Sequence, residues 1–96
     1  MADWIEILRT QTETGERMAR EVPGILGNPH VTEAQVRALF DELDKQAEFV
    51  EGLRETLEKF GHDFSVIEAA EKLEERFDDL AASAAEKLKA MRAPQT

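Results

Sequence analysis

Hydrophobic residues recur every three or four positions along two long stretches of the chain, and a short turn at residues 61–64 separates the stretches. A heptad assignment places an apolar residue at nearly every seam position, which is typical of helices that pack along one face. The seam of the first stretch is Val36, Leu39, Leu43, Gln46, Val50, Leu53, Leu57 and Phe60. That of the second is Val66, Ala70, Leu73, Phe77, Leu80, Ala84, Lys87 and Met91. Folding at the turn pairs the two seams antiparallel, so the pattern predicts a long helical hairpin.

Capping signals set the bounds of the two long helices. Thr32 followed by Gln35 predicts a capping box, and Ser65 followed by Glu68 predicts a second one. Gly61 stands where a residue in the left-handed conformation closes the preceding helix. These signals predict helices over residues 33–60 and 66–92.

A shorter helix is predicted ahead of the hairpin. Asp3 with Glu6 predicts its first turn, and Pro23 ends it, because the residue before a proline avoids the helical region. The expected helix covers residues 4–21. Its middle, around Gly15, is poor in apolar residues and in helix formers, so it is expected to be the weakest helix and to bend or fray there.

Together these elements predict an all-α fold in one domain over residues 1–92. The protomer has three helices: a short N-terminal helix and a long, coiled-coil-like antiparallel hairpin. Residues 93–96 are predicted to be a disordered tail. The length and the hairpin are similar to those of small secreted helical-hairpin dimers of the WXG type. The turn reads Phe60-Gly61-His62-Asp63 rather than Trp-x-Gly, and we assign the chain to no family.

The composition narrows the classes of partner. The 96 residues carry a net charge of -9, which disfavours nucleic acid as a direct partner, because phosphate binding needs a basic face. Without cysteine there is no disulfide and no thiolate chemistry. No apolar run approaches the roughly 20 residues of a membrane span. The N-terminus lacks the basic region of a signal peptide. We expect a cytoplasmic protein that does not contact membranes.

Candidate chemistry is sparse. His30 and His62 are the two side chains that titrate near neutrality, and they lie at opposite ends of the first long helix, about 40 Å apart. Neither has the Glu-x-x-His placement of a helical metal centre. No serine or threonine stands beside an evident base. We therefore expect no catalytic residue, no cofactor and no metal site.

Two features of the first long helix have competing interpretations. Gln46 is its one polar seam residue, and we predict that it sets the register of the hairpin at some cost in stability. The outward face carries a row of carboxylates. A solvated face is the simpler interpretation of this row, and a docking surface for a basic partner is the other. We call this row the acidic face: Asp41, Asp44, Glu48, Glu51, Glu55 and Glu58.

The leading function is a non-enzymatic helical interaction or assembly protein that self-associates, such as an adaptor, an assembly factor or a small subunit of a larger complex. The predicted N-terminal helix, about 27 Å against about 42 Å for the helix it follows, is too short to cover the turn end of the hairpin. Apolar residues left open there would pair two copies into a four-helix, two-fold homodimer. The predicted interface is Leu53, Leu57, Phe60, Ile67, Leu73 and Phe77.

Two alternatives come from other classes. One is an acidic inhibitor or nucleic-acid mimic that occupies a basic surface of its partner. The other is a helical enzyme-accessory or metal-binding protein. An acidic mimic should lose its partner steeply as salt rises, unlike a mainly apolar interface.

Overall fold

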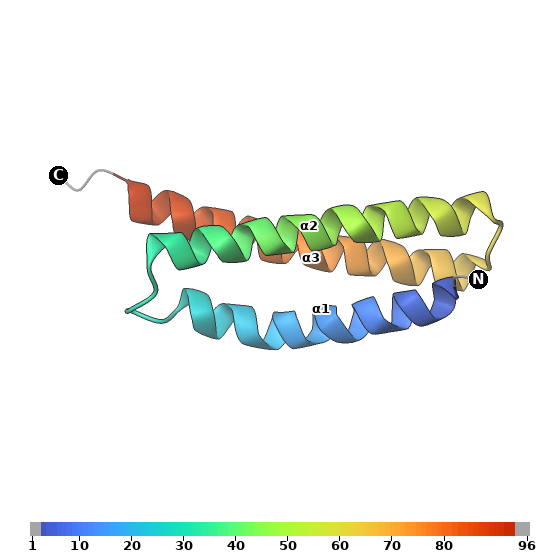
Figure 1. Cartoon of the computed structure of the whole chain (residues 1–96), viewed down its shortest axis with the longest axis horizontal. Helices are drawn as coiled ribbons and strands as arrows, with labels where there is room; N and C mark the ends of the chain where they lie inside the picture. Colours follow the sequence, from blue (N-terminus) through green and yellow to red (C-terminus); the bar gives the residue numbers. More distant parts are fainter. Residues whose placement is uncertain (1–2, 94–96) are drawn as a thin grey trace.

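The computed structural model describes residues 3–93, which form three α-helices and no β-strand. The helices are α1 (Trp4–Leu26), α2 (Glu33–Lys59) and α3 (Phe64–Arg92). They lie along one long axis in a bundle of 54 × 21 × 20 Å, with α1 antiparallel to α2 and parallel to α3 (Figure 1). The predicted all-α fold, a helical hairpin preceded by a third helix, is confirmed.

The core follows one row of the predicted seam closely. In α2 the fully buried side chains are Val36, Leu43, Val50 and Leu57, which share one heptad position. The other predicted seam row is less covered, since Leu39 is only half-buried. Residues outside the two-helix seam are buried as well, because a third helix widens the covered face. They are Ala47, Ala81 and Leu88.

The first helix is longer than predicted. It continues through Pro23 and ends at Leu26, with Gly27 as its C-cap. Proline at this position removes one backbone donor close to the helix end. Val22, the residue before the proline, is only 1% exposed, so burial of its side chain in the core overrides the local preference against helix. The predicted loop therefore shortens to residues 27–32.

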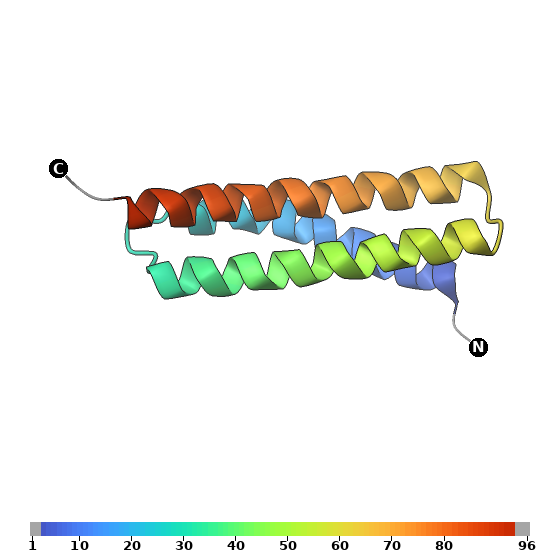
Figure 2. The same cartoon turned by 90° about the horizontal axis from the view of Figure 1, so that it is seen from above.

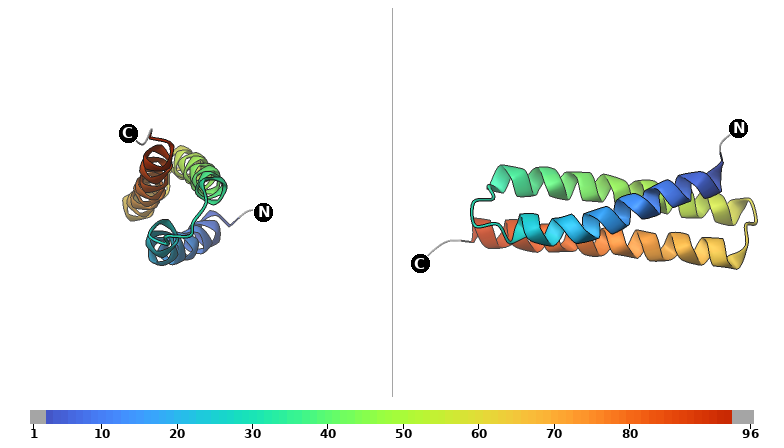
Figure 3. Two further views of the ribbon diagram at one scale, coloured as in Figure 1. Left: turned by 90° about the vertical axis from the view of Figure 1, so that its left-hand side faces the viewer. Right: turned by 90° about the horizontal axis from the view of Figure 1, so that it is seen from below.

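The predicted bend or frayed segment at Gly15 is absent. Gly15 lies within a continuous helix and is buried. A Cβ atom at this position would lie 2.7 Å from Cδ1 of Leu73 and 3.5 Å from Cζ of Phe77. The missing side chain thus lets the backbone of α1 approach α3. Figure 3 shows α1 crossing the hairpin obliquely, with its N-terminal part toward α2.

The 23 residues of α1 span about 34 Å at 1.5 Å per residue, so the helix reaches the turn end of the hairpin (Figure 1). The prediction that the N-terminal helix leaves this end uncovered is wrong. The error follows from ending the helix before Pro23. The two arms of the hairpin lie side by side over their whole length in Figure 2.

The helix caps agree with the sequence at three of four places. At the start of α1, Glu6 N–H donates to Asp3 Oδ1 at 3.2 Å. At the start of α2, Gln35 N–H donates to Thr32 Oγ1 at 3.1 Å, and Thr32 N–H donates to Gln35 Oε1 at 2.9 Å. Gly61 has a φ of 67°, as predicted for the turn. The capping box at Ser65 is wrong, because α3 begins earlier, at Phe64. There the N–H of Val66 donates to the carbonyl of Asp63 at 2.9 Å.

Candidate functional site

Four of the six residues predicted to form a dimer interface are inside the protomer. Leu57 and Phe77 are 0% exposed, Leu53 is 4% exposed and Leu73 is 5% exposed. These four side chains pack inside the protomer, so they do not form the open apolar patch that the predicted interface requires. The physical reason is the reach of α1 to the turn end. Only Phe60, at 62% exposure, and the half-buried Ile67 remain accessible.

Large apolar side chains are nevertheless exposed at this end. Five in the described residues are at least 40% exposed, and four of them belong to the half of the bundle that contains the turn. Phe60 and Phe64 flank the turn itself, with 62% and 75% of their area exposed. Ile5 on α1 and Phe49 on α2 are about half exposed, at 47% and 50%. The fifth, Ile25, lies at the opposite end of α1.

A groove between α1 and α2 is lined by one of these side chains, Phe49. It has a volume of about 350 Å³. On the α2 side of the groove, a Cβ atom at Gly52 would meet no atom within 4 Å. We call this the α1–α2 groove, and it is lined by Trp4, Glu48, Phe49, Gly52, Leu53 and Thr56.

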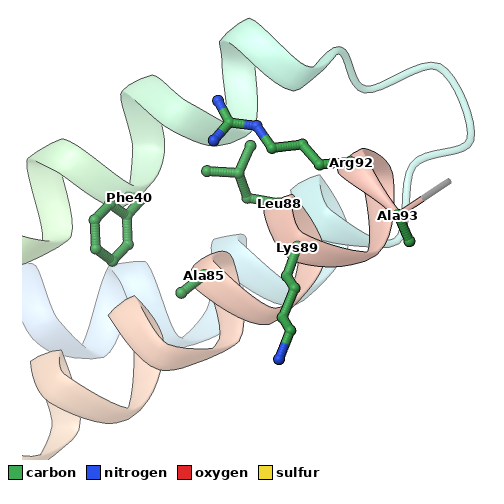
Figure 4. Close-up of a pocket in the computed structure, with 6 residues that line it drawn as sticks. All are labelled: Phe40, Ala85, Leu88, Lys89, Arg92 and Ala93. Atoms are coloured by element: carbon green, nitrogen blue, oxygen red, sulfur yellow. The ribbon is translucent and has the colours of Figure 1, made fainter.

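A larger hollow of about 540 Å³ lies at the opposite end of the bundle, between α2 and α3 (Figure 4). Its apolar walls are Phe40, Ala85 and Leu88. Arg92 extends toward α2, where its Nε bonds to Glu33. Lys89 extends away from Phe40 and Leu88 in Figure 4. Neither cation is therefore directed at the apolar walls, and the hollow does not have the arrangement of a site for an anionic ligand.

The charge of the bundle is concentrated near the turn. The turn half comprises the first half of α1, the second half of α2 and the first half of α3. It contains 13 acidic and five basic residues over 3–14 and 46–78, a net charge of -8. The other half, residues 15–45 and 79–93, contains eight acidic and seven basic residues, a net charge of -1. All six residues of the acidic face are exposed, as expected for either interpretation of that row.

One cation of the turn half joins the two arms of the hairpin. Arg54 Nε donates to Glu74 Oε2 at 2.7 Å, and Arg54 Nη1 donates to Glu58 Oε1 at 3.0 Å. The bonds to Glu74 and Glu58 raise the pKa of Arg54. Glu58 of the acidic face is thus partly neutralised.

Asp78 is the carboxylate most affected by its surroundings. Partial burial raises its pKa, and the negative charges of Glu74, Asp79 and Asp44 raise it further. The two arms therefore bring like charges together at this level of the bundle.

Gln46 does not form the bond across the seam that a register-setting residue would make. Its Nε2 donates to Glu42 Oε1 at 3.1 Å within α2. Its Oε1 is buried without a hydrogen-bond partner. The predicted role in register stays a prediction, and the cost in stability attached to it has a visible source in that unpaired oxygen.

Within residues 3–93, no three His, Cys, Asp or Glu side chains are grouped so as to hold a metal ion. Over the same range, none of the helices combines the length and the apolar character needed to cross a bilayer.

No family model matches this chain, and neither a curated protein nor a solved structure gives a significant match. The geometry defines the class as an all-α three-helix bundle. Its distinctive surface combines exposed apolar side chains with excess negative charge in the turn half.

Proposed function

We propose that the protein is a non-enzymatic interaction module that binds a basic partner protein through the turn half of its bundle. One observation carries the proposal: Ile5, Phe49, Phe60 and Phe64 are exposed in the half that holds nearly all of the net negative charge. Clustered apolar exposure is typical of an interface. The surrounding carboxylates favour a partner with Lys and Arg at the rim.

Self-association through the same end is the second candidate, and it is supported by the exposure of Phe60 and Phe64. Two turn halves that each carry a net charge of -8 would repel when they meet. Burial of Leu57 and Phe77 also removes the centre of the predicted homodimer interface. Sedimentation at micromolar concentration in low and high salt distinguishes the candidates. A dimer that persists at low salt would favour self-association.

Capture from an extract of the source organism tests the leading proposal. The bait is compared with a variant in which Phe60→Ser and Phe64→Ser remove the exposed rings at the turn. The matched control is Ile25→Ser, which changes an exposed apolar residue at the other end. We expect one partner with a basic surface, identified by mass spectrometry, to be retained by the native chain and the control and lost by the turn variant.

That partner should also be released as salt rises from about 0.1 M to about 1 M, since the Debye length shrinks from about 10 Å to about 3 Å. Equal retention by both variants, or release that does not respond to salt, would contradict the proposal.

A further inference from the structure

The α1–α2 groove has the shape, polarity and charge to receive one kind of occupant. We propose that it binds a basic amphipathic helix from the partner protein. The inference rests on the proposed function and adds to it a place on the bundle and a secondary structure for the partner.

The shape favours a helix. Phe49, Leu53 and Thr56 follow one another at intervals of four and three residues, so they form one stripe along α2. The stripe covers about 10 Å of the helix axis at 1.5 Å per residue. Because Trp4 on α1 forms the other side, the groove lies between two helices. A helix placed along it would complete a four-helix arrangement, the mode in which amphipathic helices bind to grooves.

Gly15 in α1 and Gly52 in α2 differ in what surrounds them. Gly15 is explained inside the protomer, because α3 occupies the space of its missing side chain. At Gly52 no atom lies within 4 Å of the position of its Cβ, as at Gly24 of α1, but Gly52 lines the groove and Gly24 does not. A glycine in the middle of a helix weakens the helix. Its place in the floor of the groove leaves room for a bulky apolar side chain of the partner.

The acidic residues beside the groove indicate the charge of the partner helix. Glu48 lines the groove, and Glu51 and Glu55 continue from it at intervals of three and four residues, in a row beside the apolar stripe. All three are exposed, and none forms an ion pair within residues 3–93. The complementary helix therefore carries Lys or Arg on the flank next to its apolar face. A second copy of this acidic chain does not supply that flank.

The groove contains its own reporter. Trp4 is the single tryptophan of the chain, which has no tyrosine. The probe is a helical peptide of leucine and lysine, about 18 residues or five turns long, without aromatic residues. Its binding in the groove should shift the Trp4 emission to shorter wavelength, and high salt should reverse the shift. A peptide with glutamate in place of lysine should leave the emission unchanged.

Two matched glycine variants locate the binding. Gly52→Leu fills the groove, whereas Gly24→Leu adds the same side chain at another helical position where no atom lies within 4 Å. We expect Gly52→Leu to weaken binding of the peptide by roughly tenfold or more, because the added side chain occupies the space that the peptide would fill. The Gly24→Leu variant should bind the peptide as tightly as the native chain does. Circular dichroism and thermal melting of both variants confirm that each is folded.

The outcomes separate this inference from the proposed function. If sedimentation shows that the lysine peptide binds but Trp4 emission and Gly52→Leu have no effect, the groove is not the site, and the proposed function stands with another surface. If the peptide does not bind even at low salt, both fail. If the Trp4 emission of the protein alone shifts with protein concentration, a second copy occupies the groove and the inference is overturned.

Discussion

α1 packs differently against its two neighbours, and the difference explains where the molecule is closed and where it is open. Toward α3 the backbone of α1 comes so close that a Cβ at Gly15 would lie 2.7 Å from Leu73. Toward α2 the helices leave a groove between Trp4 and Phe49. A third helix that lies obliquely on a straight hairpin cannot cover both arms equally (Figure 3). The close contact with α3 leaves no room for a side chain at Gly15, whereas the side next to α2 is open at the groove.

The largest expected difference between the two sides comes from truncating one side chain on each. Leu8 of α1 is 7% exposed in the core, and Leu8→Ala should cost about 2–5 kcal/mol through lost burial and the remaining cavity. Phe49 in the groove is 50% exposed, and Phe49→Ala should cost only about 1 kcal/mol. Urea unfolding followed by circular dichroism measures both. Equal costs would mean that the groove side is as closed as the core.

A second test uses the same substitution at two glycines and expects opposite signs. Gly52→Ala should stabilise the protein by about 0.5–1 kcal/mol, because alanine is the better helix former and nothing obstructs its Cβ. Gly15→Ala gains the same propensity but meets Leu73, and overpacking of about 1–3 kcal/mol should leave a net loss of roughly 1 kcal/mol.

A double-mutant cycle with Leu73→Ala checks that assignment. Because Leu73→Ala removes the Cδ1 atom in question, the cost of Gly15→Ala should shrink or vanish in that background. An unchanged cost would trace the effect to something other than the contact between α1 and α3.

The sequence predicted the hairpin well because its signals are local and repeated. The heptad pattern, the Thr32 capping box and the left-handed Gly61 each depend on neighbours within a few residues, and all three are present in the structure. The bounds of α1 were less predictable. The preference against helix before Pro23 is weak compared with the burial of Val22, and that burial becomes visible only in the folded chain.

The candidate site depended on this one boundary. A short α1 leaves the turn end open and makes Leu57 and Phe77 interface residues, whereas in the structure α1 reaches that end and both side chains are 0% exposed. Gly15 illustrates the same limit. Low helix propensity and close helix packing give the same sequence signal, so the pattern favoured fraying where the structure has tight contact. The role of Trp4 depends on the crossing of α1, which no periodicity encodes.

The smallest expected effect concerns the contact between α2 and α3, the two helices against which α1 packs. Partial burial and the carboxylates of Glu74, Asp79 and Asp44 raise the pKa of Asp78 above its ordinary value of 3.8. The native state therefore holds the Asp78 proton more tightly than the unfolded chain does. Stability falls as the pH rises from that ordinary value through the raised pKa, and the full cost of the charge is present above it.

Asp78→Asn should therefore stabilise the protein near neutral pH and have no effect below the ordinary pKa of aspartate, where both side chains are uncharged. Because Asp78 is largely exposed, the gain should stay within the roughly 0.5 kcal/mol typical of surface changes. Thermal melting between pH 3 and pH 7 measures this gain.

Asp41→Asn, an equal loss of charge on the acidic face away from this cluster, is the control for general relief of repulsion. If both variants follow the same pH profile, the stabilisation comes from net charge, and the α2–α3 contact has no local repulsion of its own. If only Asp78→Asn gains stability with rising pH, the repulsion is local to the two hairpin arms. In that case apolar contacts and the Arg54–Glu74 bond hold α2 and α3 together despite this repulsion.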